Sequence, residues 1–138
     1  MKTGICWLIV WAVVVGTGCR TYDRGPYLPE TSKTPPYEST ERLVLLDPGV
    51  QHSVTCSGIQ ERVLPDGRLE VTAQIRNREN RRIEVQVNCV FKDQNGYSTG
   101  DETPFQTLIL TENATEHVRF VSMNAQARKF TIRVRQAR

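Results

Sequence analysis

The 138-residue sequence has no apolar run long enough to cross a membrane, since a spanning helix needs about 20 such residues and the longest run, residues 5–15, has 11. Aromatic residues make up only 7% of the chain, and both tryptophans, Trp7 and Trp11, lie in that run. The net charge of +3 is too small to indicate a nucleic-acid partner. The short length and ordinary composition exclude a multidomain enzyme, a polytopic membrane protein and a collagen-like chain.

Patterns that carry catalysis or metal binding are also missing. The two histidines, His52 and His117, have no partner at zinc-ligand spacing, and no Cys-x-x-Cys pair occurs. The chain has neither a Gly-x-Ser-x-Gly motif nor a glycine-rich phosphate loop. The adjacent carboxylates Asp101 and Glu102 are expected to be solvated in a loop. We therefore expect a protein that is not an enzyme and that uses no metal or cofactor.

The first 19 residues have the pattern of a secretion signal. Lys2 supplies a positive start, the apolar run of residues 5–15 follows, and the small residues 16–18 (Gly-Thr-Gly) precede Cys19. This pattern resembles the lipobox of bacterial lipoprotein signals. The resemblance implies that residues 1–18 are removed and that Cys19 carries a covalent lipid, which would hold the protein on a membrane. An ordinary signal peptide or short anchor with a coincidental cysteine is the alternative.

The residues after Cys19 indicate a destination and a spacer. In lipoproteins that resemble this one, aspartate after the lipidated cysteine commonly retains the protein in the inner membrane. Because this chain has Arg20 there, the resemblance implies the outer membrane, with the protein on its periplasmic side. Residues 19–41 contain four prolines and few aliphatic residues, so we expect a disordered tether that reaches on the order of 60–70 Å when extended.

Residues 42–138 are expected to form the folded domain. Apolar and polar residues alternate with a period of two through residues 69–76 and 83–91, which is typical of half-buried strands. Turn sequences separate the runs, among them Pro65-Asp66-Gly67 and Asn95-Gly96. Further strands are expected near residues 53–63, 105–110, 118–120 and 130–134, with a short edge strand at 43–46. The pattern predicts an all-β fold, a small antiparallel Ig-like β-sandwich of six to seven strands.

The order of these motifs is similar to that of a known family. A strand ending at Asn77 is followed by an aromatic-x-Asp-x-x-Gly turn at residues 91–96, an aromatic-x-x-Leu-x-Leu strand at 105–110 and the terminal segment 127–135. This order resembles the YcfL family of periplasmic lipoproteins, over roughly residues 53–136. The resemblance implies a small Ig-like sandwich and brings no catalytic residue.

Two cysteines remain for the domain once Cys6 is assigned to the signal and Cys19 to the lipid. Cys56 and Cys89 both lie on predicted strands, and the oxidising periplasm permits disulfides. A disulfide between them would close a loop of about 33 residues and would stabilise the domain by roughly 3–4 kcal/mol. Separate buried thiols and a redox pair are the alternatives.

Basic residues suggest a binding face. One group lies near residue 80, a second lies in the last predicted strand, and no acidic residue occurs from 117 to 138. The candidate residues are Arg76, Arg78, Arg81, Arg82, Arg128, Lys129, Arg133 and Arg135. On one sheet face they could meet anionic lipid headgroups, lipopolysaccharide phosphates, peptidoglycan carboxylates or an acidic protein. The alternative is that these charges only protect edge strands from aggregation.

The sequence therefore predicts an outer-membrane-anchored periplasmic lipoprotein that is a non-catalytic accessory or binding module. Its partner would be another envelope protein or an anionic envelope polymer. A structural envelope or assembly protein without a dedicated ligand is the alternative, and a small envelope enzyme is a more distant one.

Overall fold

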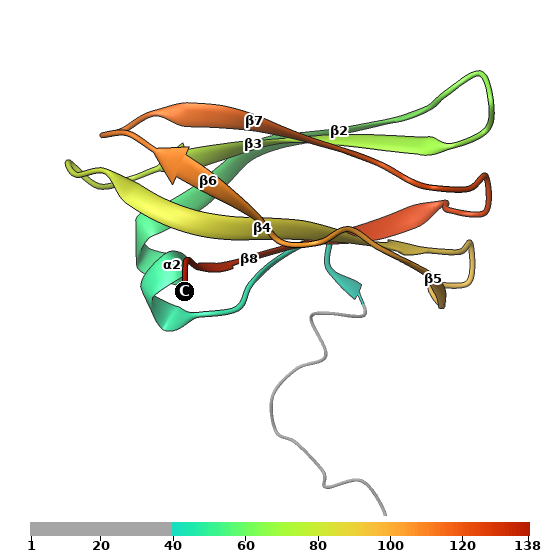
Figure 1. Ribbon diagram of the computed structural model, residues 1–138, viewed down its shortest axis with the longest axis horizontal. Coiled ribbons are helices and arrows are strands. Elements are labelled where there is room, and N and C mark those ends of the chain that lie inside the picture. Colours follow the sequence, from blue (N-terminus) through green and yellow to red (C-terminus); the bar gives the residue numbers. More distant parts are fainter. Residues whose placement is uncertain (1–39) are drawn as a thin grey trace, which may run out of the picture. The chain divides into compact units, whose positions relative to one another are not determined.

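The computed structural model of the protein describes residues 40–138. The predicted signal peptide 1–18, the lipidation site Cys19 and the tether up to residue 39 lie outside the described residues. The described part of the chain forms eight β-strands and the short helix α2, arranged as two facing sheets (Figure 1). The predicted all-β sandwich is confirmed.

The larger sheet has five strands and is built around β4 (Ile83–Lys92). Along one side of β4 lies β8 (Lys129–Gln136), which is followed by the edge strand β1 (Leu43–Leu45). Along the other side, β6 (Gln106–Leu110) pairs with the first half of β4 and β5 (Ser98–Glu102) with its last residues. Because β1 runs parallel to β8, this sheet is mixed rather than purely antiparallel.

The smaller sheet has the order β2 (Val54–Val63), β3 (Leu69–Asn77) and β7 (Thr115–Val121), and all its pairs are antiparallel. The turn after β2 has Gly67 at φ 87°, a left-handed conformation that glycine adopts without strain. The predicted hairpin at residues 65–67 is therefore confirmed.

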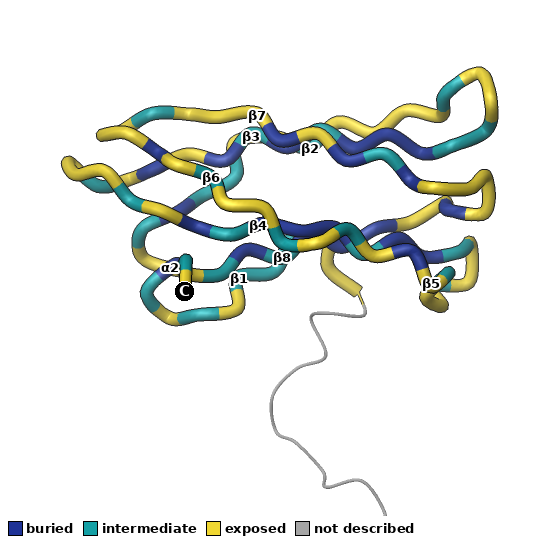
Figure 2. The backbone as a smooth tube through the Cα atoms, viewed as in Figure 1, coloured by how far each residue is buried: buried dark blue, intermediate teal, exposed yellow. Residues whose placement is uncertain are grey.

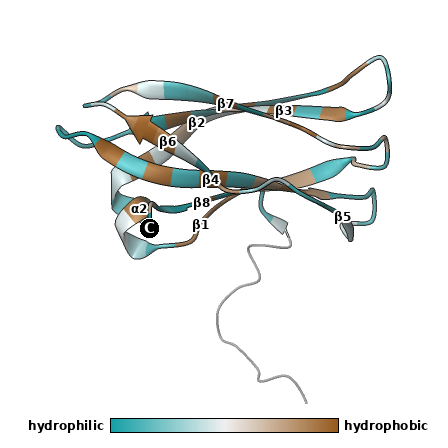
Figure 3. Ribbon diagram, in the orientation of Figure 1, coloured by the Kyte–Doolittle hydropathy of each residue, from teal (hydrophilic) through white to brown (hydrophobic). Residues whose placement is uncertain are grey.

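The core lies between the two sheets, as the dark layer of buried residues in Figure 2 shows. The alternation read from the sequence places one set of side chains inward on each strand, so that brown and teal segments alternate along β4 in Figure 3. The buried apolar residues include Val71, Ala73 and Ile75 from β3, Val85, Val87, Cys89 and Phe91 from β4, and Phe130, Ile132 and Val134 from β8.

Two elements differ from the sequence prediction. Helix α2 (Pro48–Ser53) follows β1, where no helix was expected, and it buries Val50 against the core. Strand β5 (Ser-Thr-Gly-Asp-Glu) was expected to be a loop, because its residues have weak strand propensity. Pairing with the edge of β4 makes it a strand, so the described residues hold eight strands rather than six or seven.

The predicted disulfide is not formed in the structure, because Cys56 and Cys89 are both free thiols. Cys56 lies on the edge strand β2, beside a register shift, and its Sγ donates to the Gly58 carbonyl oxygen at 3.4 Å. Cys89 is fully buried in the central strand β4 of the other sheet. Burial, with the charge of Asp101 adding to it, raises the pKa of the Cys89 thiol to about 12.

We expect one of these two thiols to react in the native protein. The raised pKa lowers the thiolate fraction of Cys89 about a thousandfold, and burial excludes the reagent, whereas Cys56 is only half buried. Titration with a thiol reagent should therefore find Cys56 in the native mature chain and both thiols after unfolding without a reductant. An unfolded chain with no reactive thiol would show instead that the disulfide forms.

Candidate functional site

The predicted basic residues do not form one face: Arg133 and Arg135 lie along β8, and the others lie at two ends of the sandwich. Arg81 and Arg82 precede the first residue of β4, whereas Lys129 pairs with Lys92, the last residue of β4. At about 3.3 Å per residue, the ten-residue strand separates these positions by roughly 30 Å. The predicted common binding face is therefore not formed, and the two ends of the sandwich are separate candidate sites.

The first of these sites is the helix end, which carries α2, the connection 78–82 and the C-terminus (Figure 1). Arg82 Nη2 lies 3.0 Å from Glu84 Oε1, and Arg81 pairs with Glu79. Arg76 and Arg78 are exposed and have no carboxylate partner among the described residues. The ion pairs at this end thus neutralise Arg81 and Arg82 but leave Arg76 and Arg78 available to an anion.

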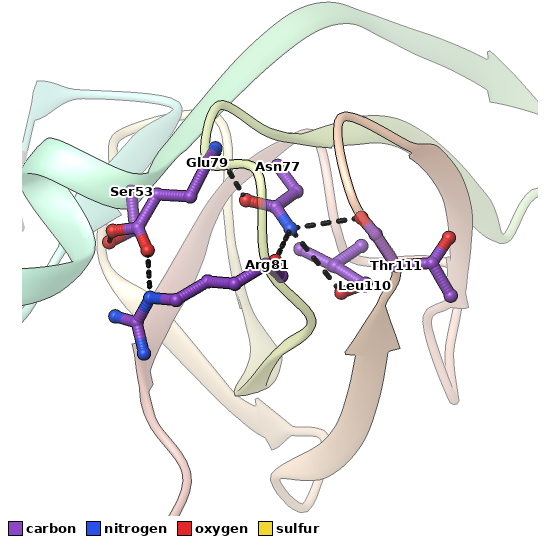
Figure 4. A network of polar contacts seen from close by, with 6 residues as sticks. All are labelled: Ser53, Asn77, Glu79, Arg81, Leu110 and Thr111. Atoms are coloured by element: carbon purple, nitrogen blue, oxygen red, sulfur yellow. Dashed lines mark hydrogen bonds and ion pairs between the residues drawn. The ribbon is translucent and has the colours of Figure 1, made fainter.

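Asn77 joins the strands at the helix end, although the sequence predicted no role for its side chain. The residue is fully buried. Its side-chain nitrogen donates to the carbonyl oxygens of Arg81 at 2.7 Å, Thr111 at 2.9 Å and Leu110 at 3.4 Å, and its Oδ1 accepts from the Glu79 amide at 2.8 Å (Figure 4). The sequence does indicate that Asn77 is buried, because this residue continues the alternation of inward-facing side chains along β3. The amide is a structural clamp.

Glu79 extends this network toward the start of β2. Its carboxylate accepts from the hydroxyl of Ser53 and pairs with Arg81 (Figure 4). These contacts, the Ser53 hydrogen bond first, hold the pKa of Glu79 below its ordinary value. The group is thus ionised and engaged in holding the connection in place.

Arg133 and Arg135 lie on the outer face of the five-stranded sheet, and both have partners. Arg135 stacks on the Phe105 ring with its guanidinium carbon 3.7 Å from the centroid, and its Nε donates to Gln86 Oε1 at 2.9 Å. Arg133 donates to Asn88 Oδ1 at 3.0 Å. These contacts fasten β8 and the β5–β6 connection to β4, which is a structural role.

Asp101 and Glu102 lie on β5 and are not the solvated loop pair that was expected. Asp101 is only 6% exposed, and its Oδ2 accepts from the Met123 amide at 2.6 Å. Glu102 pairs with Arg133 and accepts from Asn88 Nδ2 at 2.9 Å. The two carboxylates point to opposite faces of β5, as adjacent strand residues do, so they do not converge on one ligand.

The second site is the loop end, formed by the connections 64–68, 93–97 and 122–128 (Figure 1). These connections touch one another: a Cβ at Gly67 would lie 3.1 Å from that of Ala125, and the Arg128 amide donates to the Lys92 carbonyl at 2.9 Å. A hollow of about 600 Å³ opens here. We call it the loop-end hollow; its charged lining residues are Glu41, Arg42, Glu61, Lys92, Arg128 and Lys129.

Two lysines of the hollow lie directly opposite each other. Lys92 and Lys129 are register partners across β4 and β8, and like charges at such positions destabilise a sheet. Lys92 is only 8% exposed, and its Nζ donates to Thr131 Oγ1 at 2.8 Å. Thr131 in turn donates to the Glu41 carbonyl at 2.9 Å. Lys92 is thus held within the domain, whereas its register partner Lys129 is exposed.

The remaining charged residues of the hollow are Glu41, Arg42, Glu61, Arg128 and Lys129. Arg42 pairs with Glu61 at 2.8 Å and lies 5.0 Å from the centroid of the Phe130 ring. Arg128 Nη1 donates to two backbone carbonyls of its own connection, and Lys129 is exposed. The sequence predicted Arg128 and Lys129 as binding residues. It did not indicate Arg42 or Lys92, because these two residues reach the hollow only through the pairing of β1 and β4 with β8.

Two further features bear on the site. Within residues 40–138, no three His, Cys, Asp or Glu side chains are placed to hold a metal ion. No helix in that part of the chain has the length and apolar character needed to span a membrane.

Comparison with known proteins finds one family model and two similar structures. The family model, described as a protein of unknown function (DUF1425), matches residues 41–136. No curated protein matches the chain.

Both structures share the fold at low identity. The crystal structure of Campylobacter jejuni cj0090 has 17% identity and a TM-score of 0.56, over 70% of this chain and 98% of its own. A DUF1425 family member from Shewanella sp. pv-4 has 24% identity and a TM-score of 0.56, over 62% of this chain and 79% of its own.

Proposed function

Since this chain belongs to the DUF1425 family of proteins of unknown function, of which YcfL is a member, we propose that it is a lipoprotein of the bacterial envelope. The lipid on Cys19 anchors it to the outer membrane, and the domain lies on the periplasmic side. It is a non-catalytic binding module for another envelope component. The apolar run, the small residues 16–18 and Cys19 support the anchoring.

The loop-end hollow carries the binding part of this proposal. It brings Lys92, Arg128 and Lys129 together with Glu41 and the Arg42–Glu61 pair. Arg128 and Lys129 are exposed and have no carboxylate partner among the described residues, so they can bind an external anion. The component that this site fits is therefore anionic, bearing phosphate or carboxylate groups.

Photocrosslinking in cells tests this function. A benzoylphenylalanine at Asn95, which lines the hollow, is compared with one at Ile109, which is 47% exposed on β6, away from the loop end. We expect the probe at position 95 to capture one dominant anionic component, identified by mass, that the probe at position 109 does not capture.

Equal capture of many components, in proportion to their abundance, at both positions would contradict a dedicated ligand. It would favour the alternative of a structural envelope protein. A variant with Arg128→Gln and Lys129→Gln provides the second control, because it keeps the probe at position 95 while it removes two of the charges. Capture by this variant should fall if the anion is held by those side chains.

A further inference from the structure

Three exposed apolar side chains lie at the loop end of the sandwich, each on a different segment. Met123 is 83% exposed on the β7–β8 connection, Tyr97 is 73% exposed at the β4–β5 turn, and Val63 is 59% exposed at the end of β2. Of the described residues, only two other large apolar ones are exposed, Leu46 and Ile109. Single exposed apolar residues are common, but a group on adjoining segments marks an interaction surface.

Hydrogen bonds hold these apolar residues in place. The Met123 amide donates to Asp101 Oδ2 at 2.6 Å. The Tyr97 amide donates to Asp93 Oδ1 at 3.0 Å, and the Tyr97 carbonyl accepts from the Asp93 amide at 2.8 Å. The exposed side chains are therefore presented on ordered turns, and a partner can bind them without first ordering the loops.

Cations lie beside the apolar residues. Arg128 and Lys129 line the loop-end hollow together with Gly96, the residue before Tyr97. Of the nearby carboxylates, Asp66 pairs with Arg68 at 2.6 Å and Glu61 with Arg42 at 2.8 Å, whereas Asp93 and Asp101 accept backbone amides. Arg128 and Lys129 have no carboxylate partner in the described part of the chain, so they are available to an external anion.

The chain enters the domain beside the same hollow. Glu41 lines it and accepts a hydrogen bond from Thr131, and the Arg42 carbonyl accepts from the Ile132 amide at 2.8 Å. The segment that leads back to Cys19 is thus joined to the domain at the loop-end half of β8. The proposed lipid on Cys19 would hold this end of the domain at a high local concentration next to the bilayer. A weak contact with the bilayer would then be enough to keep the end bound.

We propose that the loop end of the domain seats on the phospholipid surface that holds the lipid anchor. Met123 and Val63 enter the boundary of the acyl chains, Tyr97 lies among the headgroups, and Arg128 and Lys129 meet lipid phosphates at the loop-end hollow. This inference rests on the proposed function, because it requires the anchor, and it names phospholipid as the anionic component.

The mixture of side chains favours a bilayer over a soluble anion. A carboxylated polymer would use the cations but would gain little from exposed methionine and valine, which leave water when they enter lipid. Tyrosine is enriched at membrane interfaces, where its ring is apolar and its hydroxyl is hydrated. Cations close behind such apolar residues are the arrangement that binds anionic lipid surfaces.

Single-tryptophan reporters test this orientation. Both tryptophans lie within the predicted signal, so the mature chain has no tryptophan background. Met123→Trp and Ile109→Trp are compared in the lipidated protein, reconstituted in vesicles of phosphatidylethanolamine and phosphatidylglycerol with brominated acyl chains. Residue 109 pairs with Glu84, eight positions along β4 from Lys92, so it lies about 26 Å from the loop end.

We expect the reporter at position 123 to lose roughly half its fluorescence in brominated vesicles, whereas the reporter at position 109 keeps nearly all of it. Adding Arg128→Gln and Lys129→Gln should reduce the quenching at position 123. Because Tyr97→Trp replaces one exposed aromatic with another, this variant serves as a second reporter if Met123→Trp does not fold.

The outcomes separate the inference from the proposed function. Flotation with the vesicles but equal quenching at positions 123 and 109 would overturn the seating of the loop end and leave the anchored module intact. If the lipidated protein did not float with the vesicles, both the seating of the loop end and the anchored module would be overturned. Flotation with preferential quenching at position 123 supports both.

Discussion

Replacing Asn77 with leucine is expected to lower the free energy of unfolding of the domain by about 3 kcal/mol. Leucine has a similar size but cannot donate to the carbonyls of Arg81 and Thr111 or accept from the Glu79 amide. These backbone groups would lose their partner at a fully buried position. Urea denaturation followed by circular dichroism measures the change.

Asn80 provides the matched control for this substitution. It lies in the same connection but is exposed, and its Oδ1 accepts one hydrogen bond, from Asn113 Nδ2 at 2.8 Å. Asn80→Leu should therefore change the free energy of unfolding by less than about 1 kcal/mol. If Asn77→Leu were equally mild, the buried amide could not be the clamp that joins β3, the connection 78–82 and the end of β6.

Replacing Cys19 with serine is expected to abolish attachment of lipid to the protein. A hydroxyl lacks the nucleophilic thiolate that accepts the diacylglycerol, and without acyl chains the protein loses its membrane affinity, about 0.8 kcal/mol for each buried methylene. Growth with a clickable fatty acid, followed by detection on a gel and by fractionation, measures both effects. The signal should fall from full labelling to background.

Cys6→Ser is the control for this experiment, because Cys6 is the other cysteine in the predicted signal. Its labelling should equal that of the unaltered chain, since residues 1–18 are removed from the mature protein. Labelling that persists in Cys19→Ser would place the lipid elsewhere and would remove the basis of the outer-membrane proposal.

The strands that form the core could be predicted because their signal is local. In β3 and β4, each inward residue is two positions from the next, and the register of the sheets leaves that phase unchanged. Strand β5 had no such signal, and its pairing with β4 depends on the turn at residues 93–97. The parallel pairing of β1 with β8 joins segments about 90 residues apart, which no local pattern specifies.

The candidate site could be predicted only in part, for a related reason. Arg128 and Lys129 are conspicuous in the sequence because no acidic residue follows them. Their grouping with Arg76 to Arg82 as one face does not hold, because the length of β4 places the two groups at opposite ends.

The sequence by itself determined the all-β class, most of the strands and the residues that face the core, because side-chain direction in a strand follows from position alone. It also carries the whole case for an anchor at Cys19. Only the tertiary structure decided that Lys92 lies opposite Lys129, that Asn77 bonds to three carbonyls, and that Tyr97, Met123 and Val63 share one end. These relations depend on which strands pair and in what register, and the pairing is set by the packing of the whole core.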